Sequence, residues 1–580
     1  MPEKGGNFVP VHQWRFGLLT TLVLVGIVVV WSIDGCTIKD FIKSWQFKQD
    51  YITLKVKAFV NINQTHQNPS HSLRNFTLNP TLNTTNLPLS SVDSTKSDDF
   101  SVLNWVSAEL ENNFTANLLS RWLAKGGEPC KDSETMGINI PGLDHEKMVE
   151  LSAGEIHNFV FQAVDESGNA RCLGGDYFEF DLSGDSWKSR PVVKDFGNGS
   201  YSVSLQVHPD FAGDYNLTVI LLFRHFQGLK FSPARFVFDR QLRHIGIRFF
   251  RTNAQLPQLK TCRKSDFDRD VWSGRWTRHG KNDDCRISND GRYRCLEPDF
   301  PCKSPWCNGS LGVLESNGWV YSSHCSFQLF SAGSGWDCLK DRWIFFWGDS
   351  NHVDTIRNVL NFVLDLPEIK SVPRRFDMNF SNPEDRSQTV RITSIFNGHW
   401  NGTQNYLGLD SLKDAGFRNF VKNYFSGENV PDTIIMNSGL HDGVHWLNIR
   451  AFSHGAEYAA YFWKDVMESV RQKGLPVPQI VFRSTIATGG YARSLAFNPH
   501  KMEAFNGLFL EKLRQARLVL SVIDNFDMTY SWHFDNRCND GVHYGRAPLK
   551  MKWRDGEIGH QYFVDLMLCH VLLNVVCARS

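Results

Sequence analysis

The sequence predicts an N-terminal transmembrane helix, then an all-β sandwich, then a larger α/β domain of three layers. One uncharged apolar run lies near the N-terminus, short alternating strand patterns fill residues 133–240, and apolar strands alternate with helical stretches after Cys338. At 580 residues, the chain is long enough for two or three domains.

The N-terminal apolar run extends from Phe16 to Ile33 and holds no charged residue. As a helix of about 18 residues it would span about 27 Å, enough for the hydrocarbon core of a bilayer. Trp31 and Asp34 stand where a signal-peptide cleavage site needs small residues, so an uncleaved anchor over 16–33 is favoured. Because positive charge precedes the run, we expect a cytosolic tail at 1–15 and a lumenal body.

Cysteines and sequons agree with a lumenal body. The chain has 13 cysteines: Cys36 beside the predicted anchor and twelve further on, an even number that would allow six disulfides. No C-x-x-C pair occurs, so disulfides rather than a metal site are predicted for Cys285, Cys295, Cys302 and Cys307. Nine Asn-x-Ser/Thr sequons are predicted glycosylation sites: Asn63, Asn75, Asn83, Asn113, Asn198, Asn216, Asn308, Asn379 and Asn401.

Residues 34–130 are predicted to form a lumenal stem. Its portion from 61 to 101 is rich in Asn, Ser, Thr and Pro, a composition that does not bury enough apolar surface to fold. One amphipathic helix is predicted beyond it from the near-helical spacing of Val102, Val106, Leu110, Phe114 and Leu118. The formal net charge of +1 gives no support for nucleic-acid binding.

The predicted sandwich over 133–240 rests on two alternating runs. Apolar residues alternate with polar ones at Tyr201, Val203, Leu205 and Val207, and again at Leu217, Val219 and Leu221. The segments "DFGNGSYSVSLQV" and "DFAGDYNLTVIL" resemble the filamin-type immunoglobulin-like repeat. No catalytic group of residues is visible there, so a spacer or a module that binds a protein partner is expected.

The third part, 260–577, is predicted to contain a largely parallel sheet between helical layers. Strands are expected at Trp343–Trp347, Thr433–Met436 and Gln479–Phe482, and helices near 352–364, 455–473 and 500–517.

The segment "DRWIFFWGDSNHVDTIRNVLNFVL" places Ser350 between a strand and a helix. Ligands of open α/β sheets bind at that edge, and a helix N-terminus suits a developing oxyanion. A serine nucleophile needs a base, and Asp540 and His543 stand three residues apart near the C-terminus. We therefore predict Ser350 as nucleophile, His543 as base and Asp540 as its orienter. Gly-Asp-Ser is also ordinary turn chemistry, and three other histidines compete as the base: His352, His441 and His533.

The Gly-Asp-Ser and Asp-x-x-His motifs resemble the PC-esterase branch of the GDSL/SGNH hydrolases, which includes trichome-birefringence-like and neurexophilin-and-PC-esterase proteins. The resemblance implies an SGNH-like α/β fold over 260–577 and a Golgi enzyme that adds or removes O-acetyl groups on glycans. It also implies an oxyanion hole, for which Asn437 and Gly398 are the candidates. The chain departs from the wider pattern, because residue 351 is Asn instead of Leu and the Gly-x-Asn-Asp block is replaced by Asn-Ser-Gly-Leu-His-Asp.

The expected function is acyl transfer through an acyl-serine, with O-acetyltransferase favoured over acetylesterase. The predicted location is the Golgi membrane, as a single-pass type II protein with a lumenal catalytic domain. His441 and Arg483 are predicted to contact a glycan substrate, and no cofactor is expected beyond an acyl donor such as an acetyl carrier. The alternative is a non-catalytic glycan-binding or adhesion glycoprotein, in which the α/β domain is an inherited scaffold.

Overall fold

The structure, a computed structural model, describes residues 103–124, 133–144, 148–287, 292–367, 369, 372–398, 406–534, 541–545 and 562–578. All of them belong to one structural unit, Leu103–Ser580. The predicted tail at 1–15, the anchor at 16–33 and the stem before residue 103 lie outside the described residues.

The predicted membrane location is corrected. Within the residues just given, no helix is both long and apolar enough to cross a bilayer. This finding weighs against the prediction of a single-pass type II protein of the Golgi membrane.

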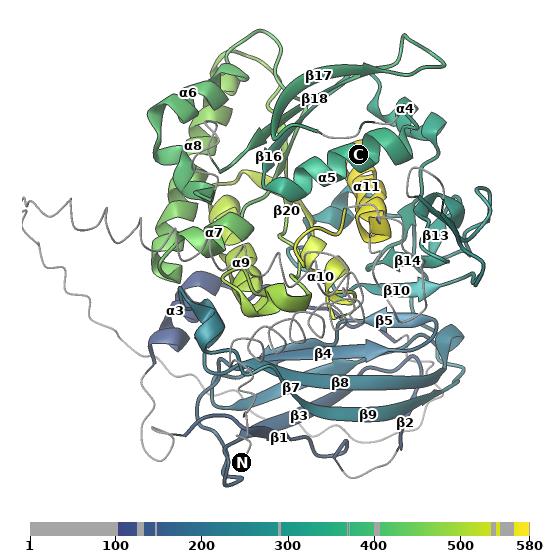
Figure 1. The fold of residues 1–580 in the computed structure, drawn as a ribbon, viewed down its shortest axis with the longest axis vertical. Helices are drawn as coiled ribbons and strands as arrows, with labels where there is room; N and C mark the ends of the chain where they lie inside the picture. Colours follow the sequence, from purple (N-terminus) through teal and green to yellow (C-terminus); the bar gives the residue numbers. More distant parts are fainter. Residues whose placement is uncertain are drawn as a thin grey trace, which may run out of the picture. The chain divides into compact units, whose positions relative to one another are not determined.

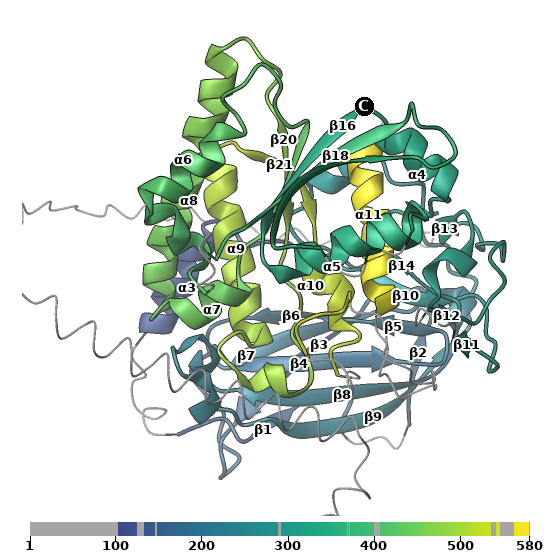
Figure 2. The ribbon, with the colours of Figure 1, turned by 45° about the horizontal axis from the view of Figure 1, so that its top comes forward.

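A six-stranded sheet carries the predicted nucleophile. Its strands lie in the order β17–β18–β16–β19–β20–β21, and only the edge strand β17 runs antiparallel to its neighbour. Figures 1 and 2 show α8 and α9 on one side of this sheet and α5 and α11 on the other. The strands are β16 (Arg342–Gly348), β17 (Arg375–Ser381), β18 (Thr389–Phe396), β19 (Thr433–Met436), β20 (Gln479–Arg483) and β21 (Val519–Ile523).

Local patterns predicted the main elements of this sheet. The runs Trp343–Trp347, Thr433–Met436 and Gln479–Phe482 lie in β16, β19 and β20, so these strand predictions are confirmed. Every residue from Trp343 to Trp347 is buried, as expected of a strand covered on both faces. The helices are α3 (Phe114–Leu123), α4 (Ala332–Leu339), α5 (Ser350–Asn358), α6 (Ala415–Asn423), α7 (Leu440–His445), α8 (Ile449–Gln472), α9 (Pro499–Gln515), α10 (Asn525–Tyr530) and α11 (Tyr562–Cys577).

The region after residue 133 forms two sheets, ordered β1–β3–β7–β6 and β14–β10–β5–β4–β8–β9–β2. The alternation predicted for Tyr201, Val203 and Leu205 is confirmed, since all three side chains are buried between the sheets. The strands are β1 (Gly137–Asn139), β2 (Met148–Ser152), β3 (His157–Val164), β4 (Tyr177–Ser183), β5 (Trp187–Ser189), β6 (Val192–Asp195), β7 (Ser200–Leu205), β8 (Gly213–Phe223), β9 (Arg240–Phe250), β10 (Arg275–Arg278) and β14 (Trp319–Ser322).

The predicted fold class is corrected. The described chain is rich in mixed and antiparallel β-sheets, and its sandwich is not separate from the region that follows it in sequence. Strands β10 and β14, which follow the predicted sandwich in sequence, extend its larger sheet, and β2 pairs with β9 in parallel. β5 has three residues and would be an open edge, and β10 covers it by antiparallel pairing.

The predicted amphipathic helix begins later than expected. Residues from Leu103 onward are irregular, and α3 starts only at Phe114. The Val106 N–H donates to Gln206 Oε1 at 2.8 Å and the Ala108 N–H to Ser273 Oγ at 2.6 Å. These bonds to distant side chains replace the helical ones.

Four disulfides join described cysteines: Cys262–Cys325, Cys285–Cys295, Cys302–Cys307 and Cys338–Cys577. The four cysteines that raised the question of zinc are therefore paired with one another. Cys569 is buried and free, so full pairing of the twelve cysteines after Cys36 does not occur.

Candidate active site

Ser350 is the first residue of α5, and Asp349 alone separates it from Gly348, the last residue of β16. Asp349 caps the helix, because its Oδ1 accepts the Asn351 N–H at 2.9 Å. A Cβ on Gly348 would lie 2.5 Å from the His352 ring, so glycine is required where the strand ends. The turn thus holds the Ser350 hydroxyl at the carboxyl edge of the sheet.

The structure brings Ser350 and His543 together, 193 residues apart in sequence. Ser350 Oγ lies 2.7 Å from His543 Nε2, within hydrogen-bonding distance for proton transfer. Neither residue is fully buried, so the pair is open to a ligand. Asp540, the predicted orienter, lies outside the described residues.

The rival histidines have other surroundings. His352 packs over Gly348 and against Phe346, and burial holds its pKa well below the usual value. His533 Nε2 bonds Glu179 at 2.9 Å. Within the described residues, His543 is therefore the histidine that contacts the Ser350 hydroxyl.

Two segments hold the loop that carries His543. On one side, the Gly489 N–H donates to the Gly541 carbonyl at 2.9 Å and the Tyr544 hydroxyl to the Ala487 carbonyl at 3.0 Å. Gly541 has a φ of 74° and packs against Gly489, which favours glycine there.

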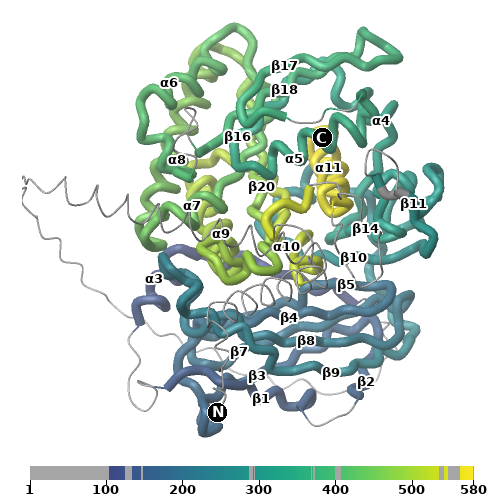
Figure 3. The backbone as a smooth tube through the Cα atoms, in the orientation of Figure 1, coloured from purple at the N-terminus to yellow at the C-terminus, as the bar shows by residue number. Residues whose placement is uncertain are grey.

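On the other side, α5 itself holds the loop. Arg357 Nη2 and Asn358 Nδ2 donate to the Gly545 carbonyl at 3.0 and 2.9 Å. Asn358 Nδ2 also donates to Asp565 Oδ2 at 2.7 Å, from α11, which Figure 3 shows beside α5. The helix that begins with the serine therefore also positions the histidine.

Arg483 lies beneath α5, away from the predicted substrate contact. It is 2% exposed, and its Nη1 donates to Thr355 Oγ1 at 3.1 Å. Its charge acts on a neighbour of the serine: burial raises the pKa of Asp349, and Arg483 opposes that shift.

The two oxyanion-hole candidates, Asn437 and Gly398, differ in the hydrogen-bond donors that they could provide. The Asn437 amide donates to the Arg483 carbonyl at 3.2 Å and to Thr485 Oγ1 at 3.3 Å, so neither of its hydrogens is left for an oxyanion. Gly398 is buried one residue after Asn397, whose N–H donates to the Gly348 carbonyl at 3.0 Å. Its backbone therefore lies beside the turn that carries Ser350.

His441, the other predicted substrate contact, lies near His543. Burial lowers its pKa to about 3, and the charges of Arg374 and His543 act in the same direction. Its ring contacts Phe396 and Tyr406, with centroids 4.9 and 5.3 Å away. A neutral imidazole at this place is able to donate or accept a hydrogen bond.

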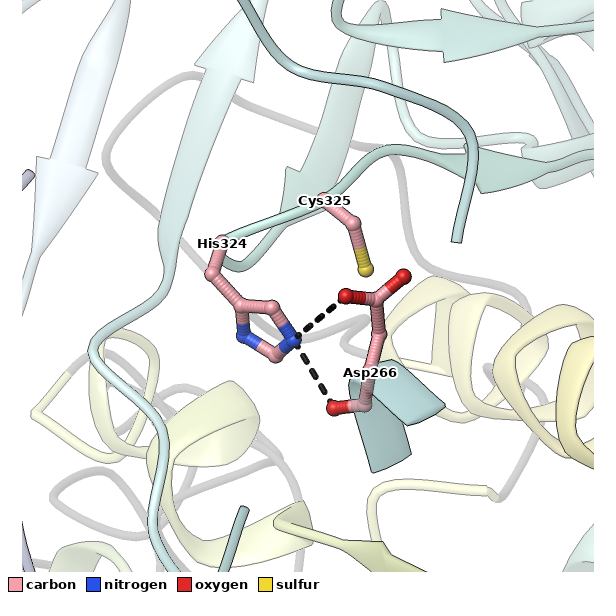
Figure 4. Close-up of side chains that lie close together, drawn as sticks. All are labelled: Asp266, His324 and Cys325. Carbon is pink, nitrogen blue, oxygen red and sulfur yellow. Dashed lines mark hydrogen bonds and ion pairs between the residues drawn. The ribbon is translucent and has the colours of Figure 1, made fainter. Parts of the chain in front are cut away.

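Among the described residues, one cluster has the spacing of a metal site: Asp266, His324 and Cys325 (Figure 4). The Cys325 sulfur is bonded to Cys262, so no thiolate is available. His324 Nε2 instead lies 2.8 Å from the Asp266 carbonyl oxygen, and burial lowers its pKa to about 4. The cluster is a structural link between two loops.

Five of the predicted glycosylation sites are in the described part of the chain, and each asparagine is exposed: Asn113, Asn198, Asn216, Asn308 and Asn379. Asn63, Asn75, Asn83 and Asn401 lie outside it.

Sequence reasoning missed the residues that support the pair. Asn358 gave no signal, because a polar residue in an amphipathic helix is normally solvated. Asp565 did give one: it is the only charged residue in α11, an otherwise largely apolar helix, and it is 4% exposed. A lone buried carboxylate requires partners, here Thr355 and Asn358.

Neither a family model nor a curated protein matches the chain. Among solved structures, Axe2, an acetylxylan esterase from Geobacillus stearothermophilus, is 12% identical, with 42% of this chain and 98% of Axe2 covered and a TM-score of 0.24. The Lin-41 filamin domain is 15% identical, with 20% and 98% covered and a TM-score of 0.14. Domains 4 and 5 of the S-layer protein SbsC are 11% identical, with 20% and 54% covered and a TM-score of 0.14, so the chain spans about half of that structure. These similarities are weak and do not show the activity of the chain.

Proposed function

We propose that the chain is a serine-dependent acyl-transfer enzyme that removes O-acetyl groups from glycans or transfers them between sugar hydroxyls. The observation that carries the proposal is the 2.7 Å contact between Ser350 Oγ and His543 Nε2 at the start of α5. The motif resemblance to PC-esterases supports an acetyl ester on a glycan as the substrate. No cofactor is needed beyond the acyl donor.

The first half of the reaction acylates the serine. His543 Nε2 takes the Ser350 proton as Oγ bonds to the acetyl carbonyl carbon, and the carbonyl oxygen becomes an oxyanion. The N-terminal N–H groups of α5 and the Gly398 backbone support that charge. The C–O bond to the donor then breaks, and His543 returns the proton to the leaving oxygen.

The second half releases the acetyl group. His543 takes a proton from water or from a sugar hydroxyl, whose oxygen attacks the acyl-serine, and Ser350 leaves with that proton. Water gives free acetate, and a sugar gives a new ester. His441, neutral and next to the pair, is placed to bind the glycan.

The test is labelling with a fluorophosphonate probe, followed by incubation with an acetylated oligosaccharide and a free acceptor. Ser350→Ala should abolish labelling and His543→Ala should slow it strongly. Ser331→Ala is the matched control, because Ser331 also caps a helix. Labelling that survives Ser350→Ala would exclude Ser350 as the nucleophile, and the ratio of free acetate to new ester separates esterase from transferase.

A further inference from the structure

A buried carboxylate from the sandwich lies among residues of the region that carries the catalytic pair. Glu179 is on β4, and its side chain is fully buried. It forms an ion pair with Arg493, which is 12% exposed, and its Oε1 lies 2.9 Å from His533 Nε2. The neighbouring Phe180 N–H donates to the Tyr530 hydroxyl at 3.2 Å, so β4 is attached at two consecutive residues.

The charged groups around Glu179 favour the ionised form of its carboxyl group. Burial alone would raise the pKa of its carboxyl, but Arg493 and His533 outweigh burial and lower it to about 2. The other ring nitrogen of His533 bonds the Tyr530 carbonyl, so both of its nitrogens face acceptors. Removal of the Glu179 charge would leave these buried donors without a carboxylate.

The partners of Glu179 lead directly to the loop of His543. The Gly490 N–H donates to the His533 carbonyl at 3.3 Å, and Arg493 lies three residues further on. The adjacent Gly489 N–H donates to the Gly541 carbonyl at 2.9 Å, and a Cβ on Gly541 would lie 2.8 Å from Ala492. Residues 487–493 therefore bond the sandwich at one end and the His543 loop at the other.

From this arrangement we infer that Glu179 is a positioning residue for His543, so that the sandwich forms part of the machinery of the proposed acyl transfer. The inference rests on the proposed function. It replaces the expectation of a spacer with a defined role: the carboxylate fixes residues 487–493, and these fix the loop that presents the imidazole to Ser350. A displacement of about 1 Å at a reacting group lowers rates by up to about 100-fold.

The test is the rate constant for fluorophosphonate labelling of the full chain as a function of pH, with thermal unfolding measured alongside. Glu179→Gln keeps the shape and removes the charge, and it should label about 10- to 100-fold more slowly with an altered pH profile. Hydrogen exchange at 541–545 should be faster. Asp239→Asn is the matched control, because Asp239 pairs with the same guanidinium at 2.9 Å but is 44% exposed, and it should label like the wild type.

A milder variant guards against loss of folding. Arg493→Lys keeps a cation beside Glu179 but loses the guanidinium group that donates more than one hydrogen bond to the carboxylate. This variant should still fold, and its labelling should be several-fold slower than that of the wild type. A folded Glu179→Gln or Arg493→Lys variant that labels with the wild-type rate and pH profile would overturn the positioning role of Glu179 but not the proposed function. Unfolding of both variants would also overturn it, because the pair would then serve the fold as a whole. A wild-type chain that does not label would refute the proposed function itself.

Discussion

Asn358→Ala tests how α5 holds the proposed base. The wild-type amide donates to the Gly545 carbonyl at 2.9 Å and to Asp565 Oδ2 at 2.7 Å, and the residue is fully buried. The substitution removes both bonds at once. It leaves Arg357 as the helix residue that still bonds Gly545.

The magnitude follows from these two bonds. A hydrogen bond to a carboxylate contributes about 1.5–3 kcal/mol and one to a carbonyl about 1 kcal/mol, so the chain should lose about 3 kcal/mol of stability. Because Gly545 lies two residues after His543, the imidazole should move relative to Ser350. We expect fluorophosphonate labelling to slow by about 10-fold.

The assay compares Asn358→Ala with Asn361→Ala, three residues further along. Asn361 also makes two side-chain bonds, both to the Ile369 backbone at 2.8 and 3.0 Å. Its loss should lower thermal stability without slowing the labelling of Ser350. Equal labelling rates for the two variants would refute the view that Asn358 positions the base.

Three further predictions concern a buried carboxylate, a disulfide and the His441 imidazole. Burial and the neighbouring Asp524 raise the pKa of Asp527 to about 7. The folded chain therefore binds more protons than the unfolded chain between about pH 4 and pH 7, and its stability should fall as pH rises through that window. Asp527→Asn should flatten this fall in thermal unfolding scans. Replacement of both Cys338 and Cys577 by serine opens a loop of 239 residues and should cost about 5 kcal/mol in denaturant unfolding. His441→Ala should lower kcat/KM for an acetylated glycan by about 10-fold, mainly through KM, while labelling by a small probe stays nearly unchanged.

Local sequence patterns predicted the place of Ser350 between a strand and a helix because the necessary information is contiguous. An apolar strand, a tight turn and an amphipathic helix surround Ser350 within about twenty residues, and each element follows from its own periodicity. His543 needed more than periodicity, and only its spacing from Asp540 and its place near the C-terminus singled it out. The structure puts it 2.7 Å from the hydroxyl.

The remaining features depend on contacts that no local pattern encodes. β10 joins the sandwich sheet through pairing with β5, across a gap of more than eighty residues. Arg483 is the last residue of the buried strand β20, and Thr355 of α5 and Asp565 of α11 hold the Arg483 guanidinium beneath α5. The Asn437 amide likewise bonds the strand next to its own.

The most direct test of the central claim is a rapid-quench experiment with an acetylated oligosaccharide, followed by mass spectrometry of the peptide that contains Ser350. The account predicts one acetyl group on Ser350 in the wild-type chain, formed faster than product appears, and far less of it in His543→Ala. Product formation with no acetyl group on Ser350, or an unchanged amount of acetyl-serine in His543→Ala, would contradict it.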